Sequence, residues 1–118
     1  MKLKILAPFF FLVIVLMFSC KKEEDLVDLS DVNCSSVTAK YSADIVPIVN
    51  ASCAKSSCHN AGSSKGDFTT YAGLKVKADN GTLTKAIVTE QYMPKSGTLT
   101  KEQRAKFKCW IESGAPQN

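Results

Sequence analysis

The most informative stretch of the sequence is residues 53–59, which read CAKSSCH. Four residues separate the two cysteines, and a histidine directly follows the second one. His59 is the only histidine in the 118-residue chain, and Cys53 and Cys58 are two of its five cysteines. This concentration of thiol and imidazole groups predicts covalent or metal chemistry here, with the remaining elements folded around it.

A c-type haem requires these residue types in this order. Two thiols form thioethers with the vinyl groups of the porphyrin, and a histidine beside the second thiol binds the iron. The usual attachment signature has two residues between the cysteines, whereas this chain has four, which makes the pattern less specific. The covalent requirement is only that both sulfurs reach the vinyl carbons. We therefore expect one haem c held by Cys53, Cys58 and His59.

The candidate ligand for the opposite side of the iron is Met93. The other two methionines, Met1 and Met17, lie in a predicted export segment. Pro94 and Gly97 restrict the loop after Met93, which lowers the entropy cost of holding a weak thioether ligand in place. The alternative is that Met93 fills an apolar gap after a helix. Without a methionine ligand, the iron would keep a position open to external ligands.

The N-terminus has the composition of a bacterial export signal. A positively charged start precedes an apolar run over residues 5–18, which is too short to span a bilayer comfortably. Cleavage after Ser19 would make Cys20 a lipid-modified N-terminus. We expect residues 1–19 to be a lipoprotein signal peptide and the protein to be anchored in the cell envelope, on the periplasmic or the surface side of the outer membrane. A plain secretory peptide or an uncleaved anchor is the alternative.

Residues 20–36 are predicted to be a flexible acidic tether, because they are rich in Asp and Glu and poor in large apolar groups. The remaining residues, 37–118, suffice for one small domain, which we expect to be monomeric. The formal net charge of the whole chain is +4. Its lysines are interspersed with acidic residues, which indicates a solvated surface and argues against a nucleic-acid partner.

Helical periodicity begins at Tyr41, after which three apolar residues share one face: Ile45, Ile48 and Val49. Asp44 is the predicted N-cap, because a helix starting there places Pro47 in its first turn, where a missing N–H costs nothing. This helix should end near residues 50–53. After a glycine- and serine-rich loop, Thr69 or Thr70 can cap a second helix, which residues 80–81 (Asn-Gly) would end.

Residues 83–88 are expected to add one or two helical turns. The last helix has the clearest signals, because Thr100 with Gln103 forms a capping box and residues 114–116 (Gly-Ala-Pro) end the helix. Its inward face is predicted to carry three large apolar side chains and one aliphatic stem: Phe107, Trp110, Ile111 and Arg104. No stretch sustains the alternation of a β-strand, so we predict an all-α fold with long loops.

From Tyr41 to Asn118 the chain resembles the small monohaem cytochrome c-like domains of bacterial lipoproteins. The resemblance is carried by five short motifs: Ile-Val-Pro-Ile at 45–48, Thr-Tyr at 70–71, Met-Pro at 93–94, Trp-Ile at 110–111 and Gly-Ala-Pro at 114–116. It implies a helical domain around one haem over residues 37–118. It also implies electron transfer to a redox partner protein rather than enzymatic activity.

Cys34 and Cys109 remain after these assignments. In an oxidising envelope compartment we expect them to form a disulfide that joins the segment before the first helix to the last helix. Such a crosslink would add stability that a small domain needs. The alternative is that each of the two cysteines is free.

Two other interpretations use the same residues. A haem-free, disulfide-stapled binding module would pair Cys53 with Cys58 in a tethered lipoprotein. A zinc site would use Cys53, Cys58, His59 and Cys109, although thiolate–zinc sites are uncommon where thiols are readily oxidised. A Cys-His or Ser-His nucleophile is disfavoured, because the single histidine is already assigned.

Overall fold

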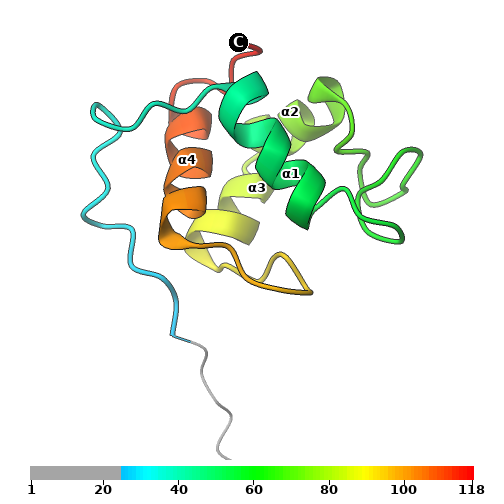
Figure 1. Ribbon diagram of the computed structural model, residues 1–118, viewed down its shortest axis with the longest axis horizontal. Coiled ribbons are helices and arrows are strands. Elements are labelled where there is room, and N and C mark those ends of the chain that lie inside the picture. The colour runs from blue at the N-terminus through cyan, green and yellow to red at the C-terminus, as the bar shows by residue number, and fades with distance from the viewer. Residues whose placement is uncertain (1–24) are drawn as a thin grey trace, which may run out of the picture.

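The computed structural model describes residues 25–118 (Figure 1). Its helical segments are, in chain order, η2 (Tyr41–Ile45), α1 (Val46–Ser52), α2 (Tyr71–Asp79), α3 (Thr82–Thr84), η3 (Lys85–Thr89) and α4 (Lys101–Glu112). No strand occurs within this range, and long loops join α1 to α2 and η3 to α4. The prediction of an all-α fold with long loops is therefore confirmed for the described residues.

Three predictions concern residues that the structure does not describe. The signal peptide over residues 1–19, the lipid attachment at Cys20 and the first part of the tether all lie outside the described range. Within residues 25–118, none of the helices has the length and apolar character needed to cross a membrane.

The first helical segment begins earlier than predicted. η2 starts at Tyr41 with a π-helical turn, in which the Ile45 N–H donates to the Lys40 carbonyl five residues before it, and α1 continues from it. Asp44 is therefore not the N-cap. Its carboxylate accepts the Lys40 backbone N–H at 2.8 Å and pairs with Lys106 of α4 at 3.0 Å. The side chain thus stabilises the start of the helix from inside the first turn.

The other helix boundaries follow their capping signals. Thr70, rather than Thr69, caps α2 by accepting the Gly73 N–H at 3.2 Å. Both bonds of the capping box of α4 are present, with distances of 3.2 and 2.9 Å between Thr100 and Gln103. These boundaries could be predicted because each cap is a contact between residues three apart.

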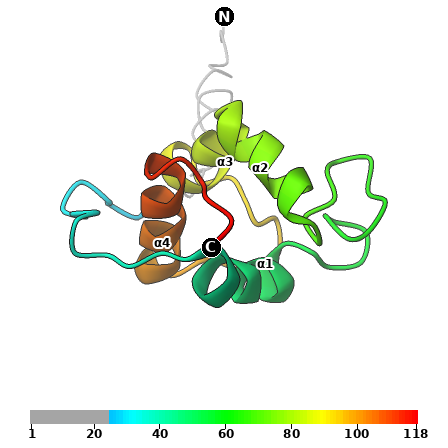
Figure 2. The same ribbon diagram turned by 90° about the horizontal axis from the view of Figure 1, so that it is seen from above.

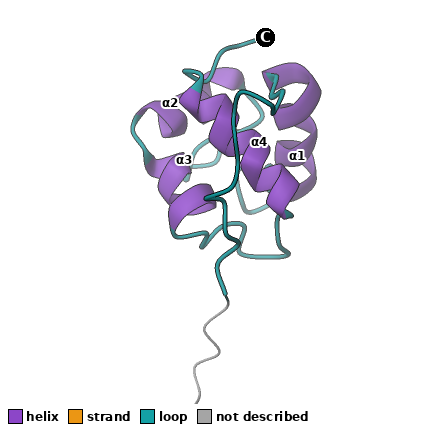
Figure 3. Cartoon of the chain, turned by 90° about the vertical axis from the view of Figure 1, so that its left-hand side faces the viewer, coloured by secondary structure: helices purple, strands orange, loops and turns teal. Residues whose placement is uncertain are grey.

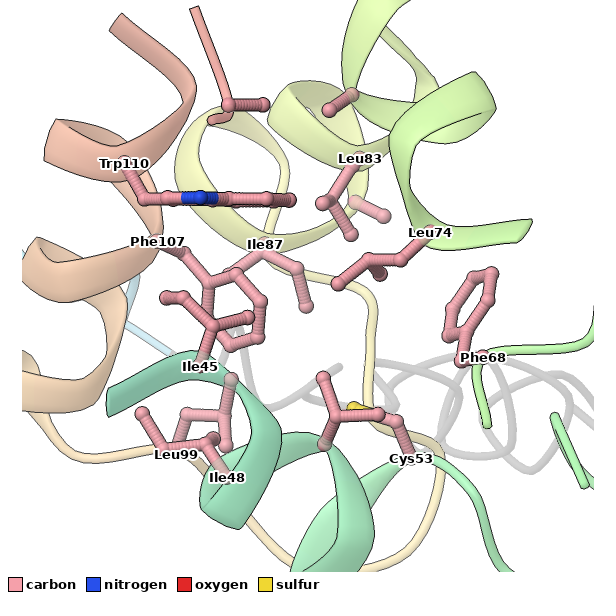
Figure 4. Packing of buried hydrophobic residues seen from close by; sticks show 14 residues of the cluster. Ile45, Ile48, Cys53, Phe68, Leu74, Leu83, Ile87, Leu99, Phe107 and Trp110 are labelled. Carbon is pink, nitrogen blue, oxygen red and sulfur yellow. The ribbon is translucent and has the colours of Figure 1, made fainter. Parts of the chain in front are cut away.

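The hydrophobic core is formed by buried side chains from all the helical segments, η2, α1, α2, α3, η3 and α4 (Figure 4). Five side chains are fully buried there: Trp110, Phe107, Ile45, Leu74 and Ile87. The buried Arg104 guanidinium donates from Nη1 to the Ile87 carbonyl at 2.7 Å. The predicted inward face of α4 is thus confirmed for Phe107, Trp110 and Arg104, whereas Ile111 is only partly buried.

The C-terminal segment after α4 turns back over the core and ends near the start of η2 (Figure 2). The Trp110 Nε1–H donates to the Pro116 carbonyl at 2.9 Å, and the Tyr71 hydroxyl donates to the Ala115 carbonyl at 2.8 Å. Asn118 accepts the Ser42 backbone N–H at 2.9 Å. These bonds satisfy polar groups of Trp110 and Tyr71 that are partly shielded from water, and they connect the C-terminal segment to α4, α2 and η2.

Residues 25–36, here called the N-terminal arm, run along α4 (Figure 3). Leu29 is buried, and Asp31 forms an ion pair with Lys101 at 2.7 Å. The expectation of little fixed structure before residue 36 therefore does not match the described part of this segment. Its partners lie up to 75 residues away in the sequence, so its acidic composition gave no sign of them.

Cys34 and Cys109 form a disulfide that joins the N-terminal arm to α4, as predicted. Cys109 is buried on α4, so the crosslink is attached to the helix at a position shielded from solvent. The bond spans a sequence separation of 75 residues, and a loop of this length loses much conformational entropy when it is closed in the unfolded chain.

Replacing Cys34 and Cys109 together by alanine should lower the free energy of unfolding by about 2–5 kcal/mol, because the unfolded chain regains the entropy of an open loop. Urea denaturation followed by the fluorescence of Trp110, the only tryptophan, measures this change. Treating the wild-type protein with a reductant is the matched control and should give a similar loss. Equal stability of the oxidised wild type and the double variant would contradict the role of the crosslink.

Candidate functional site

A cavity of about 360 Å³ lies beside the core, between the end of α1 and the loop that joins η3 to α4. Small-molecule sites commonly have volumes of roughly 300–1,000 Å³, so this cavity is at the lower end of that range. Most of its lining is apolar, with these contributors: Cys53, Phe68, Leu74, Leu83, Ala86, Ile87, Met93 and Phe107. Figure 4 shows Cys53 and Phe68 on the opposite side of the buried cluster from Trp110.

The segment with the two cysteines folds into a closed loop. Cys53 ends α1 and is buried, whereas Cys58 is half-buried. The Cys58 N–H donates to the Lys55 carbonyl at 3.0 Å, and the His59 N–H donates to the Cys53 carbonyl at 3.1 Å. Both sulfurs are free thiols, and both residues line the cavity. The four-residue spacer therefore forms a turn that keeps Cys53, Cys58 and His59 together.

The imidazole of His59 is held by two neighbours that follow it in the chain. Its Nδ1 lies 3.1 Å from the Gly66 carbonyl oxygen. Because a carbonyl only accepts, Nδ1 carries the proton in this contact, and Nε2 of the neutral ring has a free lone pair. The Phe68 ring stacks on the imidazole, with centroids 4.0 Å apart and planes 3° from parallel. Metal-binding histidines commonly donate their other ring N–H to a carbonyl or carboxylate, which fixes the orientation of the ring.

Gly66 is required for this arrangement. Its φ angle is +113°, a conformation that residues with a side chain rarely adopt. A Cβ atom at this position would lie 3.1 Å from Cε1 of Phe68. The Phe68 N–H also donates to the His59 carbonyl at 3.0 Å, which closes the loop over residues 59–68. These contacts could not be predicted, because residues 60–66 have only the composition of a glycine- and serine-rich loop.

Met93 lines the same cavity, reached from the loop after η3. It is half-buried, packs against the core, and donates its backbone N–H to the Ala86 carbonyl at 3.1 Å. The structure thus brings all four predicted site residues to one cavity: Cys53, Cys58, His59 and Met93.

The ligand set of the alternative zinc site is not brought together. Its fourth member, Cys109, is bonded to Cys34. Over residues 25–118, no three His, Cys, Asp or Glu side chains are grouped closely enough to hold a metal ion. A tetrahedral thiolate–zinc centre therefore does not fit the arrangement of these residues.

Three lysines also line the cavity, and no sequence motif predicted this. Lys65, Lys77 and Lys95 all line it, and no Asp or Glu does so within the described part of the chain. They come from three separate segments, so their proximity could not be read from the order of residues. An apolar cavity with positive charge and no negative charge suits an apolar ligand that carries carboxylates.

Comparison with known protein families, curated proteins and solved structures finds no match for this chain. The chemistry of the cavity therefore follows from its own residues.

The two thiols of the cavity, Cys53 and Cys58, differ in environment. Burial, with a smaller contribution from the nearby Cys58, raises the pKa of the Cys53 thiol from 9.0 to about 11. The folded state thus favours the protonated thiol of Cys53. The free energy of unfolding is unaffected by this group below pH 9 and falls as the pH rises from 9 towards 11, because the unfolded chain loses the proton first.

At pH 8, the thiolate fraction of Cys53 should be about 100-fold lower in the folded haem-free protein than in the unfolded chain, because burial raises its pKa from 9.0 to about 11. Iodoacetamide should therefore label Cys58 well before Cys53, and peptide mass spectrometry measures the order. The same reaction in urea is the control and should label both cysteines at similar rates. Equal rates in the folded protein would contradict the burial of Cys53.

Proposed function

We propose that this protein is a c-type cytochrome, a cytochrome c-like helical domain that transfers single electrons through one haem bound covalently in the cavity. The observation that carries the proposal is the convergence of two free thiols and a fixed imidazole in one apolar cavity. Cysteines kept together and unpaired beside a histidine are what covalent haem attachment requires.

The residues fit a haem c by their chemistry. Cys53 and Cys58 would hold the porphyrin by thioethers, and His59, through Nε2, and Met93 would be the candidate iron ligands. A bound haem would supply the one-electron chemistry of its iron. The lysines Lys65, Lys77 and Lys95 would neutralise the propionate carboxylates.

The apolar residues of the cavity would limit the access of water to the haem. Leu74, Ile87 and Phe107 are buried and form an apolar wall that excludes water from the inner end. A low-polarity environment stabilises a neutral centre over a charged one and helps to set the reduction potential. The hydrogen bond from Nδ1 to Gly66 and the stack on Phe68 keep Nε2 in one orientation.

The haem-free binding module is the second candidate. In its predicted form Cys53 and Cys58 are paired, whereas both are free in the structure.

The observed disulfide, Cys34–Cys109, agrees with an oxidising compartment. We therefore propose an exported, lipid-anchored, monomeric protein of the cell envelope, which passes electrons to a redox partner protein.

Haem attachment tests the proposal directly. The full chain expressed with a cytochrome c maturation system should bear one haem that survives denaturing electrophoresis and gives the alkaline-pyridine spectrum of a thioether-linked porphyrin. The single changes Cys53→Ser and Cys58→Ser should each remove one thioether, and His59→Ala should abolish stable loading. The matched control, Cys34→Ala with Cys109→Ala, removes two cysteines outside the cavity and should keep the haem. A colourless wild-type protein would overturn the proposal in favour of the binding module.

Replacing Met93 by leucine should lower the reduction potential of the loaded protein and allow cyanide to bind the ferric form, because leucine keeps the volume but lacks the sulfur ligand. The fall should be a substantial part of the roughly 0.8 V range over which axial ligands set haem potentials. Spectroelectrochemistry and a cyanide titration measure the two effects. Met93→Ala should act in the same direction, whereas an unchanged potential in both variants would show that Met93 only packs.

A further inference from the structure

The loop that carries Met93 begins at a residue with an unusual backbone. Gln91 has a φ angle of +52°, in the left-handed region that residues other than glycine, asparagine and aspartate seldom occupy. Its side-chain Nε2 donates to the Val88 carbonyl at 3.1 Å, at the end of η3. A costly conformation of this kind persists only where the surrounding contacts over-determine it.

Those contacts come from the N-terminal arm. The Val27 N–H donates to Oε1 of Gln91 at 2.9 Å, and Nε2 of Gln91 donates to the Val27 carbonyl at 2.8 Å. The amide side chain thus pairs with the backbone of Val27 as a neighbouring β-strand residue would, 64 positions away in the sequence. We call this pair of hydrogen bonds the Val27–Gln91 clasp.

The arm itself is fixed, so the clasp has a rigid base. Beyond Val27, the arm buries Leu29, pairs Asp31 with Lys101 and is bonded through Cys34 to α4. On the other side of the clasp, only Tyr92 separates Gln91 from Met93, and the Met93 N–H reaches back to the Ala86 carbonyl. The residues that follow are freer, because Lys95 to Thr98 are exposed.

We propose that Gln91 is a positioning residue, through which the N-terminal arm holds Met93 against the cavity. The clasp and the Met93 N–H bond fix the first residues of the loop, and the exposed remainder supplies little restraint. The segment that leads from the expected lipid anchor would then control how firmly the distal side of the site is closed. This inference rests on the proposed function for the role of Met93 as a ligand.

The test compares Gln91→Asn with the wild-type full chain, both with and without haem. Asparagine tolerates the left-handed backbone, so the fold is kept, but its shorter amide cannot pair with Val27 as glutamine does. In the haem-free protein, hydrogen exchange of the Met93 amide should become at least about tenfold faster, as expected when a set of hydrogen bonds near it is lost. In the loaded protein, cyanide should bind the ferric form faster by a similar factor.

Asp31→Asn is the matched control. It breaks the ion pair of the arm with Lys101 and leaves the atoms of the clasp in place, so exchange at Met93 should stay within about twofold of the wild type, as for an exposed ion pair. Circular dichroism and the fluorescence of Trp110 check that both variants are folded. Unchanged exchange of the Met93 amide in Gln91→Asn would overturn the inference.

The two proposals fail in different ways. If the wild-type protein takes up no haem, the proposed function is wrong, while the exchange measurement on the haem-free chain still decides whether the clasp holds the loop. If exchange at Met93 accelerates but cyanide binding to the loaded protein does not change, the positioning role of Gln91 at the distal side is overturned.

Discussion

The structure depends on the burial of Trp110, a residue of α4, against the start of η2 and the C-terminal segment. The indole stacks on Tyr41 at the start of η2, with ring centroids 5.8 Å apart, and its N–H is satisfied by the Pro116 carbonyl. A buried aromatic ring of this size contributes a large share of the apolar area that a small domain can bury. The first helix, the last helix and the returning C-terminus are therefore arranged around one side chain. Cys53 and Phe68, which line the cavity, lie on the far side of the same core (Figure 4).

The parts of the fold that could be predicted are those that depend on contacts between residues close together in the sequence. The caps at Thr70 and Thr100 join residues three apart, and the inward position of Phe107 follows from helical periodicity. The errors at Asp44 and over residues 25–36 have different causes. The helix starts at Tyr41 with a π-helical turn, which places Asp44 inside its first turn. The arm is held by contacts far along the chain, which no local pattern reveals.

The candidate site shows the same division. Cys53, Cys58, His59 and Met93 could be selected by their chemistry alone, because few other residues of the chain could bind a metal centre or its porphyrin. The groups that orient them could not. Phe68 stacks on the imidazole only because Gly66 adopts a positive φ angle, and no side-chain pattern identifies such a loop.

The position of the disulfide has a consequence for maturation. If the chain is exported as proposed and crosses the membrane from its N-terminus, Cys34 would enter an oxidising compartment shortly before Cys53 and Cys58, and long before Cys109. The native bond joins Cys34 to Cys109, 75 residues away, and not to either of the two cysteines that lie between them in the sequence. Premature pairing of Cys34 with Cys53 or Cys58 would be a misfolded branch that needs reshuffling. Any process that occupies Cys53 and Cys58 early would remove these two competitors for Cys34 and favour the bond to Cys109.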